Sequence, residues 1–550
     1  MMNLGRNFHK IILILLVIFL SAAFLSPLLS HTFYESHDGE AHLARFAAYT
    51  KAFQDGQFPP RWAGDLNFGY GTPVFIFYYP LPGYLASLMH FGGMSFEMIF
   101  KLLMIAGFLL APICFYLWAK LLFKKEVAVI GALLYGLAPY HFLDLYVRGD
   151  IAEVLAFIFV PLVFWAIEKT VTEKKNMFII WGGIFYGLLI LSHNGVSLMF
   201  SPVFLLYGII RSKNKKLFAS IVVLFFIGLV LSAFFWMPAL YEGRYVNTKL
   251  FIGNMYKDNF PTVLQLIISR WGFGADVAKA NGLSPQLGLI PFGFAVAACS
   301  LFFKEKKKRK IFGMWLGVFA AAVFITLPIS NSVWSHISLL RLYEFPWRFV
   351  GLVSFAAAVL ACFVLEKIHN KKIFIVLLLA ILITSLPLVR VKKYISESDA
   401  YYAHFAGTTD YHGAATSIWT AGEPNTFAKH QIELIGGQGK IDVVEKKSVG
   451  HVLAAHAKNE VAVLDNTHYF PGWKVFVDGV SVPIQFQDPN HRGFITFQVP
   501  KGEHTVKVIF TESPIRLLGD IVSLVSWIVI ILLVTLWIRL NYRKPRGARR

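Results

Sequence analysis

Residues 35–45 read Glu35-Ser36-His37-Asp38-Gly39-Glu40-Ala41-His42-Leu43-Ala44-Arg45 and directly follow the first hydrophobic segment of the chain. If Ser36 caps a helix that continues to Gly56, a rotation of about 100° per residue places Asp38, His42 and Arg45 on one stripe. Such a helix would lie flat on a membrane surface and present a carboxylate to one side. The alternative is an ordinary amphipathic surface helix whose acidic and imidazole groups are simply solvated.

Composition indicates the class of protein that surrounds this stretch. Of the 550 residues, 56% are hydrophobic and only 15% are charged, whereas soluble proteins carry about 25% charged residues. We therefore expect a polytopic membrane protein. The net charge of +20 would suggest nucleic-acid binding if the cations formed one patch, but they lie in short runs between apolar segments. This distribution indicates membrane topology and argues against a nucleic-acid partner.

Twelve apolar segments predict twelve membrane spans. If the N-terminus is cytoplasmic, the Lys and Arg runs of every short loop and of the tail at 539–550 fall inside, as the positive-inside rule requires. Both termini are then cytoplasmic in a plasma membrane. The first segment is long enough to remain as an anchor, although a cleaved signal peptide is the alternative. The predicted spans are residues 11–30, 98–123, 127–143, 151–168, 178–193, 196–210, 217–240, 286–303, 311–329, 349–366, 373–389 and 517–538.

The aromatic stretch Val74 to Phe91 is ambiguous, because it is apolar but contains Pro80, Pro82 and Gly83. If it crossed the membrane, every later cation run would face outward. We therefore predict a re-entrant or interfacial segment within the first outer loop, residues 31–97.

Residues 390–514 differ from the rest of the chain, because they are more polar and alternate between apolar and polar positions. This alternation predicts a β-sandwich-like outer domain, with Asp478-Gly479 as a hairpin turn. The chain thus divides into a membrane domain (1–389), an exoplasmic β-rich domain (390–514) and a final span with a basic cytoplasmic tail (515–550). The predicted strands are residues 461–464, 473–477, 482–486, 494–499 and 505–510.

Four more polar clusters lie on the predicted outer face. Each has a plain structural alternative: an interfacial ion pair, a helix cap, an aromatic belt or a turn. Taken together, a carboxylate and several guanidinium groups in one leaflet suit the binding of a lipid phosphate while an acceptor is deprotonated. The clusters are Arg148-Gly149-Asp150 with Glu153, His193-Asn194, Arg341 with Glu344 and Arg348, and Arg61-Trp62 with Gly69-Tyr70-Gly71.

Known nucleotide and metal motifs are absent from the sequence. It contains no Walker loop, no dinucleotide-binding glycine fingerprint beside a strand, no HExxH and no Cys/His ligand spacing. The cysteines, Cys114, Cys299 and Cys362, all lie in apolar segments, so we expect neither a disulfide framework nor a Cys metal site. Nucleotide-driven chemistry on the inner face is not expected.

These motifs resemble a family of bacterial membrane proteins. Its members belong to the glycosyltransferase-C superfamily, in particular the group called 6-pyruvoyl-tetrahydropterin-synthase-related, a label that does not imply pterin chemistry. Residues 469–479 and 499–504 are similar to the C-terminal region of YfhO-like membrane glycosyltransferases. The remaining motifs that carry the resemblance are His37-Asp38-Gly39, Arg61-Trp62, Gly69-Tyr70-Gly71, Tyr78-Tyr79-Pro80, Arg148-Gly149-Asp150 with Glu153, Ser192-His193-Asn194 and Phe345-Pro346-Trp347-Arg348-Phe349.

The resemblance implies an inverting glycosyltransferase whose first outer loop bears the catalytic Asp and whose sugar donor is linked to polyprenyl phosphate. Asp38 then corresponds to the general base, with Glu40 as the alternative carboxylate and Asp150 or Glu153 as a second acidic position. Some superfamily members use a divalent metal, to which Asp38 and His42 could contribute, and the metal requirement stays open. The candidates for binding donor phosphate or substrate are His42, Arg45, Arg61, Arg148, His193, Arg341 and Arg348.

The expected reaction transfers a sugar to a glycan, lipid or protein acceptor of the cell envelope. A transporter or flippase of lipid-linked glycans is one alternative, although its ionisable residues should lie deep in the spans rather than at their ends. A non-catalytic envelope assembly protein is the other, although twelve spans are many for an anchor.

Overall fold

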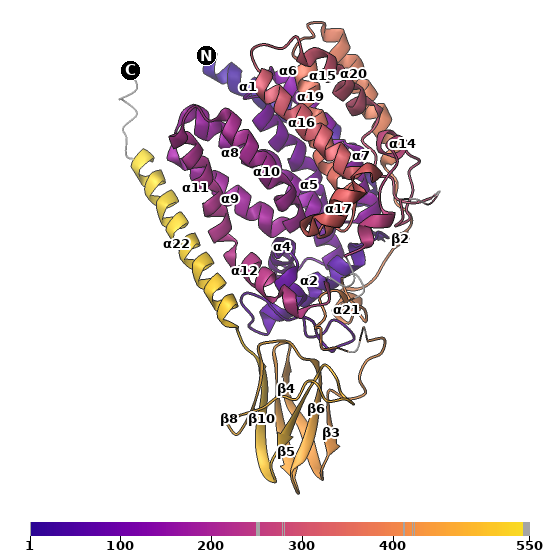
Figure 1. The fold of residues 1–550 in the computed structure, drawn as a ribbon, viewed down its shortest axis with the longest axis vertical. Helices are drawn as coiled ribbons and strands as arrows, with labels where there is room; N and C mark the ends of the chain where they lie inside the picture. Colours follow the sequence, from indigo (N-terminus) through magenta and orange to yellow (C-terminus); the bar gives the residue numbers. More distant parts are fainter. Residues whose placement is uncertain are drawn as a thin grey trace.

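The structure, a computed structural model, describes residues 2–248, 253–277, 279, 281–410, 413–420, 422 and 424–542. It consists of a helix bundle and two β-sheets, which precede the last helix of the chain (Figure 1). The predicted basic tail at 539–550 lies outside the described residues beyond residue 542.

Most of the described chain is helical. Seven of the described helices are long and apolar enough to cross a membrane, and two bent helix pairs raise the number to nine if each pair is one span. The first pair bends by 41° and the second by 73°. The seven are α5 (Phe96–Ala119), α8 (Ile151–Glu173), α10 (Asn194–Arg211), α16 (Arg309–Thr326), α19 (Val350–Leu365) with the turn Pro346–Phe349 before it, α20 (Lys371–Ser385) with the turn Leu386–Leu388 after it, and α22 (Pro514–Tyr542). The pairs are α6 (Lys125–Gly136) with Pro139–Arg148, which includes α7 (Pro139–Phe142), and α11 (Lys215–Leu231) with Ala233–Tyr245, which includes α12 (Ala233–Glu242).

Three shorter apolar helices complete the set: α1 (Met2–Ala22), α9 (Asn176–Ser192) and α15 (Leu289–Phe302). Each of the twelve predicted spans falls on one of these helices or pairs. The polytopic helical fold is therefore confirmed, whereas the number twelve stays a prediction. The reason is length, because 14 residues of α15 rise about 21 Å, less than the roughly 30 Å of a hydrocarbon core.

The centre of the bundle is aromatic. Phe355 of α19 is fully buried and its ring lies 5.5 Å from Trp118, 5.3 Å from Phe164 and 5.5 Å from Trp315, measured between centroids. These rings join α5, α8 and α16 around α19. The start of α1 and the end of α22 lie at one end of the bundle and the sheets lie at the other, which we call the sheet end (Figure 1).

The first loop forms short elements at the sheet end: α2 (Gly39–Gln54), α3 (Val74–Phe77) and α4 (Leu81–Phe91). With 4 and 11 residues, α3 and α4 are too short to span, as predicted for this stretch. Helix α2 begins one residue after Asp38, not after Ser36, and most of it is buried instead of lying on a surface. The cover comes from α4, α5 and the segment that follows β2.

Residues 394–420 pack on this first loop before the sheets begin. Strand β1 (Phe33–Tyr34) pairs with β2 (Tyr394–Ile395) in antiparallel register, and α21 (Asp399–Ala403) lies against α2. Other short helices of the described chain are α14 (Val263–Ile267), α17 (Asn331–His336) and α18 (Ser338–Arg341).

The two sheets pack face to face around a common apolar core that includes Val463, Val475 and Val508. The predicted two-residue hairpin is confirmed, because Asp478 and Gly479 have φ of 48° and 83° and Val477 pairs with Val480. Residues 432–457 also form strands, which were not predicted from the sequence. Strand β4 (Gly439–Lys447) is exposed along nearly its whole length and lacks the alternation of a half-buried strand, whereas β5 (Gly450–Ala457) does alternate and was missed. One sheet has the order β4-β5-β10-β7-β8 and the other β3-β6-β9, with β3 (Ile432–Gly436), β4 (Gly439–Lys447), β5 (Gly450–Ala457), β6 (Val461–His468), β7 (Trp473–Val477), β8 (Val480–Val482), β9 (Phe494–Val499) and β10 (Gly502–Phe510).

Candidate functional site

Two loops meet through their backbones at the sheet end. The amide N–H of Asp38 donates to the carbonyl of Arg148 (2.7 Å), and that of His37 donates to the carbonyl of Val147 (3.0 Å). Glycine permits this approach, because a Cβ at Gly39 or Gly149 would overlap the Ser36 hydroxyl. Gly149 also has a left-handed φ of 68°. The first loop and the start of α8, 110 residues apart, thus share one site.

Arg148 ends a π-helical turn, Leu143–Arg148, that closes the bent span α6–α7. Such turns often mark functional positions, because they change the direction of the side chains that follow. The Arg148 guanidinium forms ion pairs with Asp144 and Glu153, and its Nη2 lies 2.6 Å from Asp150 Oδ2. All four side chains are buried. We call Asp144, Arg148, Asp150 and Glu153 the acid cluster.

Each oxygen of Asp150 and Glu153 already accepts a hydrogen bond. Asp150 caps α8 by accepting from the Glu153 amide (3.0 Å), and Tyr140 donates its hydroxyl to Glu153 Oε1 (2.9 Å). The other oxygen of each carboxylate accepts from Arg148. The orientation of both carboxylates is therefore fixed.

Three rings line the side of the acid cluster that faces the first loop. Tyr79 stacks on His193 (5.1 Å between centroids) and on His42 (6.3 Å). His193 caps α10 by accepting from the Val196 amide at Nδ1 (3.0 Å), which leaves Nε2–H 4.0 Å from Asp150 Oδ2. Burial, and then the charge of Arg45, lowers the pKa of His42 well below its ordinary value, so His42 is neutral at pH 7.

Two further arginines approach with unused donors. Arg45 donates from Nη2 to the Thr409 carbonyl (2.8 Å) and stacks over Tyr78 at 4.5 Å. Arg348 pairs with Glu344 (3.0 Å). The Nε groups of both arginines and Nε1 of Trp347 are buried, and no described residue accepts a hydrogen bond from them. Trp347 links this group to the acid cluster, because its ring lies 4.9 Å from the Arg148 guanidinium carbon.

The structure brings Asp38, His42, Arg45, Arg148, Asp150, Glu153, His193 and Arg348 together, but it places three other predicted site residues apart. Glu40 accepts from the Tyr401 hydroxyl (2.9 Å). Arg61 binds Asp520 (2.6 Å) and the Phe234 carbonyl (2.8 Å) beside α22. Arg341 ends α18, and within the described residues its side chain has no hydrogen bond or ion pair.

Asp38 is the least constrained carboxylate of the site. It is half-buried, and no described residue donates a hydrogen bond to its side chain. Burial raises the pKa of Asp38, and the nearby Arg148 only partly opposes this. For Asp150, burial also acts to raise the pKa, but Arg148 together with His193, His42 and Arg348 outweighs it and lowers the pKa below its usual range. Two neighbouring carboxylates thus have opposite shifts, an arrangement typical of sites that divide acid and base roles.

Sequence reasoning missed three members of this site. Asp144 carried a usable signal, since it lies four residues before Arg148 inside an apolar segment, where an unpaired charge is costly. Tyr79 stands within the family motif Tyr78-Tyr79-Pro80 but was given no role, and Tyr140 carried no signal, because aromatic residues are common throughout this chain.

A divalent metal fits this site poorly. Asp150, Glu153 and His193 do offer ligand atoms within 4.8 Å of one another. However, every oxygen of the two carboxylates is occupied by a donor, and His193 Nδ1 is used as a cap. A metal would have to displace Arg148, so we assign no step to one.

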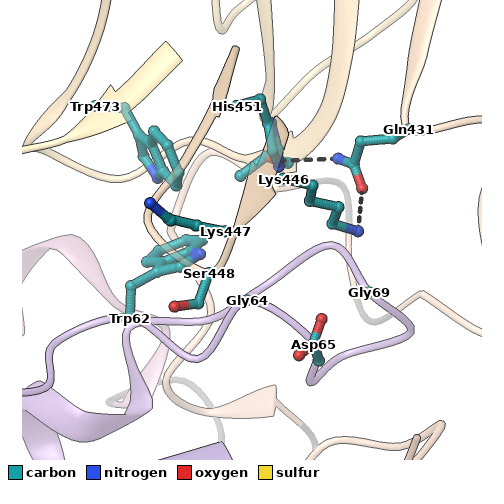
Figure 2. Close-up of a pocket in the computed structure, with 11 residues that line it drawn as sticks. Trp62, Gly64, Asp65, Gly69, Gln431, Lys446, Lys447, Ser448, His451 and Trp473 are labelled. Carbon is teal, nitrogen blue, oxygen red and sulfur yellow. Dashed lines mark hydrogen bonds between the residues drawn. The ribbon is translucent and has the colours of Figure 1, made fainter. Parts of the chain in front are cut away.

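A second polar recess lies between the first loop and the sheets (Figure 2). Its cavity of about 10 Å³ has room for about one water molecule and not for a sugar. His451 pairs there with the buried Asp465 (2.6 Å), and Lys446 donates to Gln431 (2.7 Å). We therefore interpret the recess as a packed contact between the first loop and the sheets.

Comparisons with known proteins agree with the predicted group. A family model described as "6-pyruvoyl-tetrahydropterin synthase related domain; membrane protein" matches residues 75–391. An uncharacterized protein of Lactococcus lactis subsp. cremoris (strain MG1363) is 26% identical over 246 residues, which are 42% of this chain and 40% of that protein. This chain thus matches well under two thirds of that relative's length.

Solved structures also align with part of this chain. Arabinofuranosyltransferase AftD from Mycobacteria, determined by single-particle cryo-electron microscopy, aligns over 68% of this chain and 26% of its own, with TM-score 0.48 and 14% identity. Its R1389S mutant, class 2, aligns with TM-score 0.45 and 15% identity, over 68% of this chain and 27% of its own.

Proposed function

We propose a function for this chain from one premise: it belongs to the family of membrane proteins that carry a 6-pyruvoyl-tetrahydropterin synthase related domain. The proposed function is glycosyl transfer, from a sugar linked to polyprenyl phosphate to a glycan, lipid or protein of the cell envelope. The site motifs that resemble glycosyltransferase-C proteins support this assignment over pterin chemistry.

One observation carries the proposal. A half-buried carboxylate without a hydrogen-bond donor, Asp38, shares a site with buried guanidinium and indole N–H groups that lack an acceptor. Buried donors without partners cost about 1–3 kcal/mol each, so a ligand that accepts from Arg45, Arg348 and Trp347 would recover that energy. A phosphodiester supplies such acceptors and one negative charge.

The reaction follows from these roles. Asp38 takes the proton of an acceptor hydroxyl as the hydroxyl oxygen attacks the anomeric carbon of the donor sugar. The bond from that carbon to the phosphate oxygen breaks, and polyprenyl phosphate leaves with the electron pair. Arg45 and Arg348 stabilise the departing charge. Attack from the face opposite the phosphate inverts the anomeric centre.

The location of the site supports transfer on the outer face. Helix α2, which begins at the site, lies at the sheet end, away from the start of α1 and the end of α22 (Figure 1), whereas cation runs such as Lys304–Lys310 lie in loops assigned to the cytoplasm. A donor whose lipid tail stays in the bilayer could then reach Asp38 from the membrane. We propose cytoplasmic termini and an exoplasmic β-domain at 390–514.

Transfer by the purified protein tests the proposal. We expect reconstituted wild type to move labelled sugar from at least one polyprenyl-phosphate donor to an envelope extract, and Asp38→Asn to be inactive. Donor crossing the vesicle membrane without transfer would instead indicate a flippase. Neither transfer nor crossing, from a folded protein tested against a panel of donors, would favour a non-catalytic assembly role.

A further inference from the structure

The acid cluster and the adjacent His193 offer side chains of the types that bind divalent metals, but a guanidinium lies at the centre of the cluster. Two carboxylates and an imidazole, from Asp150, Glu153 and His193, bring ligand atoms within 4.8 Å of one another, and such groups are ordinary ligands of divalent cations. Among the described residues, no other group of three or more ligating side chains is arranged in this way.

Arg148 sits where a cation bound by this group would have to sit. Its two terminal nitrogens contact three carboxylates, and Nη2 reaches Asp150 Oδ2 at 2.6 Å. The side chain is 2% exposed, and its outer face is covered by the Trp347 ring. No rotation at the surface would release it, because backbone hydrogen bonds hold residues 147 and 148 to the first loop.

We propose that Arg148 is a built-in cation that replaces a divalent metal in this site. The inference rests on the proposed function for its consequence, which is that transfer proceeds without a metal. The planar fork of Arg satisfies several carboxylate oxygens at once and keeps its charge at any working pH. Arg148 acts through the carboxylates and is therefore a positioning residue.

The acid cluster contains more carboxylates than cations. Three buried carboxylates face one guanidinium, and Asp144 Oδ2 is buried without any donor among the described residues. Removal of Arg148 would leave an acidic pocket beside a free imidazole nitrogen. Such a pocket should gain affinity for a divalent cation.

Mn²⁺ binding, followed by electron paramagnetic resonance, tests the inference without any assay of transfer. Wild-type protein should show no saturable Mn²⁺ site, and chelator should leave its transfer rate unchanged. A stoichiometric site in wild type that disappears in Glu153→Gln would overturn the inference, even if transfer is confirmed. This arm needs no Arg148 variant, so misfolding cannot hide the answer.

Variants of Arg148 provide the second arm. Arg148→Ala should gain one saturable Mn²⁺ site, at a Mn²⁺ concentration at least ten times below that at which wild type shows any binding, and the gain should vanish in Arg148→Ala with Glu153→Gln. Its transfer rate should fall and partly recover with guanidinium ions or Mn²⁺. Arg148→Ala that is folded, as judged by thermal unfolding and elution as one species, yet gains no Mn²⁺ affinity contradicts the proposal.

Arg211→Ala is the matched control. Arg211 also pairs with a buried carboxylate, Glu168, which accepts from Tyr207 as well (2.7 Å). Only one carboxylate is present there, and neither histidine nor a second acid accompanies it in the contacts of the described residues. We therefore expect no gain in Mn²⁺ binding. If both alanine variants gained Mn²⁺ affinity equally, the effect would be nonspecific and the inference would fail.

Discussion

Two clusters of buried arginines and carboxylates lie at the sheet end, and they differ in what they leave unpaired. Beside α22, Arg516 donates to Glu242 (2.9 Å) and to the Pro471 carbonyl (2.7 Å), while Arg61 binds Asp520 (2.6 Å). We call these residues the α22 joint. Around the acid cluster, by contrast, no described residue donates a hydrogen bond to the Asp38 side chain. The buried Nε of Arg45 and that of Arg61 both lack a hydrogen-bond acceptor, but only the Nε of Arg61 lies near a carboxylate, 3.6 Å from Glu512 Oε1.

The contrast separates structure from chemistry. In the α22 joint, Arg516 is matched to Glu242, Arg61 is matched to Asp520 and lies 3.6 Å from Glu512, and both arginines also donate to backbone carbonyls. This arrangement ties the last helix to α12 and the sheets. Around Asp38, burial of polar groups that have no hydrogen-bond partner lowers the stability of the fold and holds no element in place. Groups held in this way are the ones that a substrate can use, and the predictions below test that distinction.

The largest expected difference lies between two aspartates. Asp38→Asn should lower transfer by about 10²–10⁴-fold, the usual contribution of a general base, with unchanged thermal unfolding. Asp520→Asn in the α22 joint should leave turnover per folded molecule within about twofold, because its carboxylate touches no reacting group. Transfer rates measured on folded, monodisperse protein compare the two variants. An active Asp38→Asn would move the base elsewhere.

Arg516→Ala should have the opposite signature. Removal of one partner leaves Glu242 buried with only the Ser513 hydroxyl as donor (2.7 Å), and a broken buried ion pair typically costs about 3–5 kcal/mol. We expect a much lower unfolding temperature, measured in detergent, and a near-normal turnover at temperatures where the variant is folded. A stable Arg516→Ala would show that the α22 joint is not what anchors the last helix.

The sequence predicted the membrane class, the helix positions and the β-rich domain, because apolar segments and alternating strands leave strong periodic signals. It also singled out Asp38, Arg148 and Asp150, whose charges stand out in an apolar chain and which the structure places side by side; their roles stay a prediction. It could not separate Arg348 from Arg341 or Asp38 from Glu40. Those distinctions depend on which way a side chain turns in a loop, and tertiary contacts such as the Tyr401 hydroxyl on Glu40 decide that.

Arg348 and Arg341 therefore form the next test. Arg348→Ala should raise the donor KM by about 10- to 100-fold, as expected for a lost hydrogen bond to a charged group worth about 1.5–3 kcal/mol, with a smaller effect on the acceptor KM. Arg341→Ala should leave both constants unchanged. Initial rates at varied donor and acceptor concentrations separate the two. Equal effects from both variants would assign Arg348 to general electrostatic attraction.

The pH dependence should be smaller but diagnostic. Since burial raises the pKa of Asp38, kcat/KM should fall as pH drops, with a midpoint above the ordinary aspartate value of about 3.9. The free energy of unfolding should change in the opposite direction with pH. The Asp38 carboxyl stays protonated to a higher pH in the folded state than in the unfolded state, so its contribution to stability decreases as pH rises from about 3.9 through the raised pKa. A pH profile of transfer, with Asp150→Asn as a second probe, checks the midpoint.

The smallest effect is expected at Glu40, the other acid of the first loop. Its carboxylate accepts from the Tyr401 hydroxyl and points to α21, so it resembles the paired acids of the α22 joint more than Asp38. Glu40→Gln keeps an acceptor for that hydroxyl, and we expect a change in transfer of less than about twofold. Tyr401→Phe should change transfer equally little, because it removes the partly exposed hydrogen bond that Glu40→Gln weakens. If Glu40→Gln abolished transfer while Asp38→Asn did not, the base would be the carboxylate that already has a partner, and unpaired burial would cease to mark the reactive group in this fold.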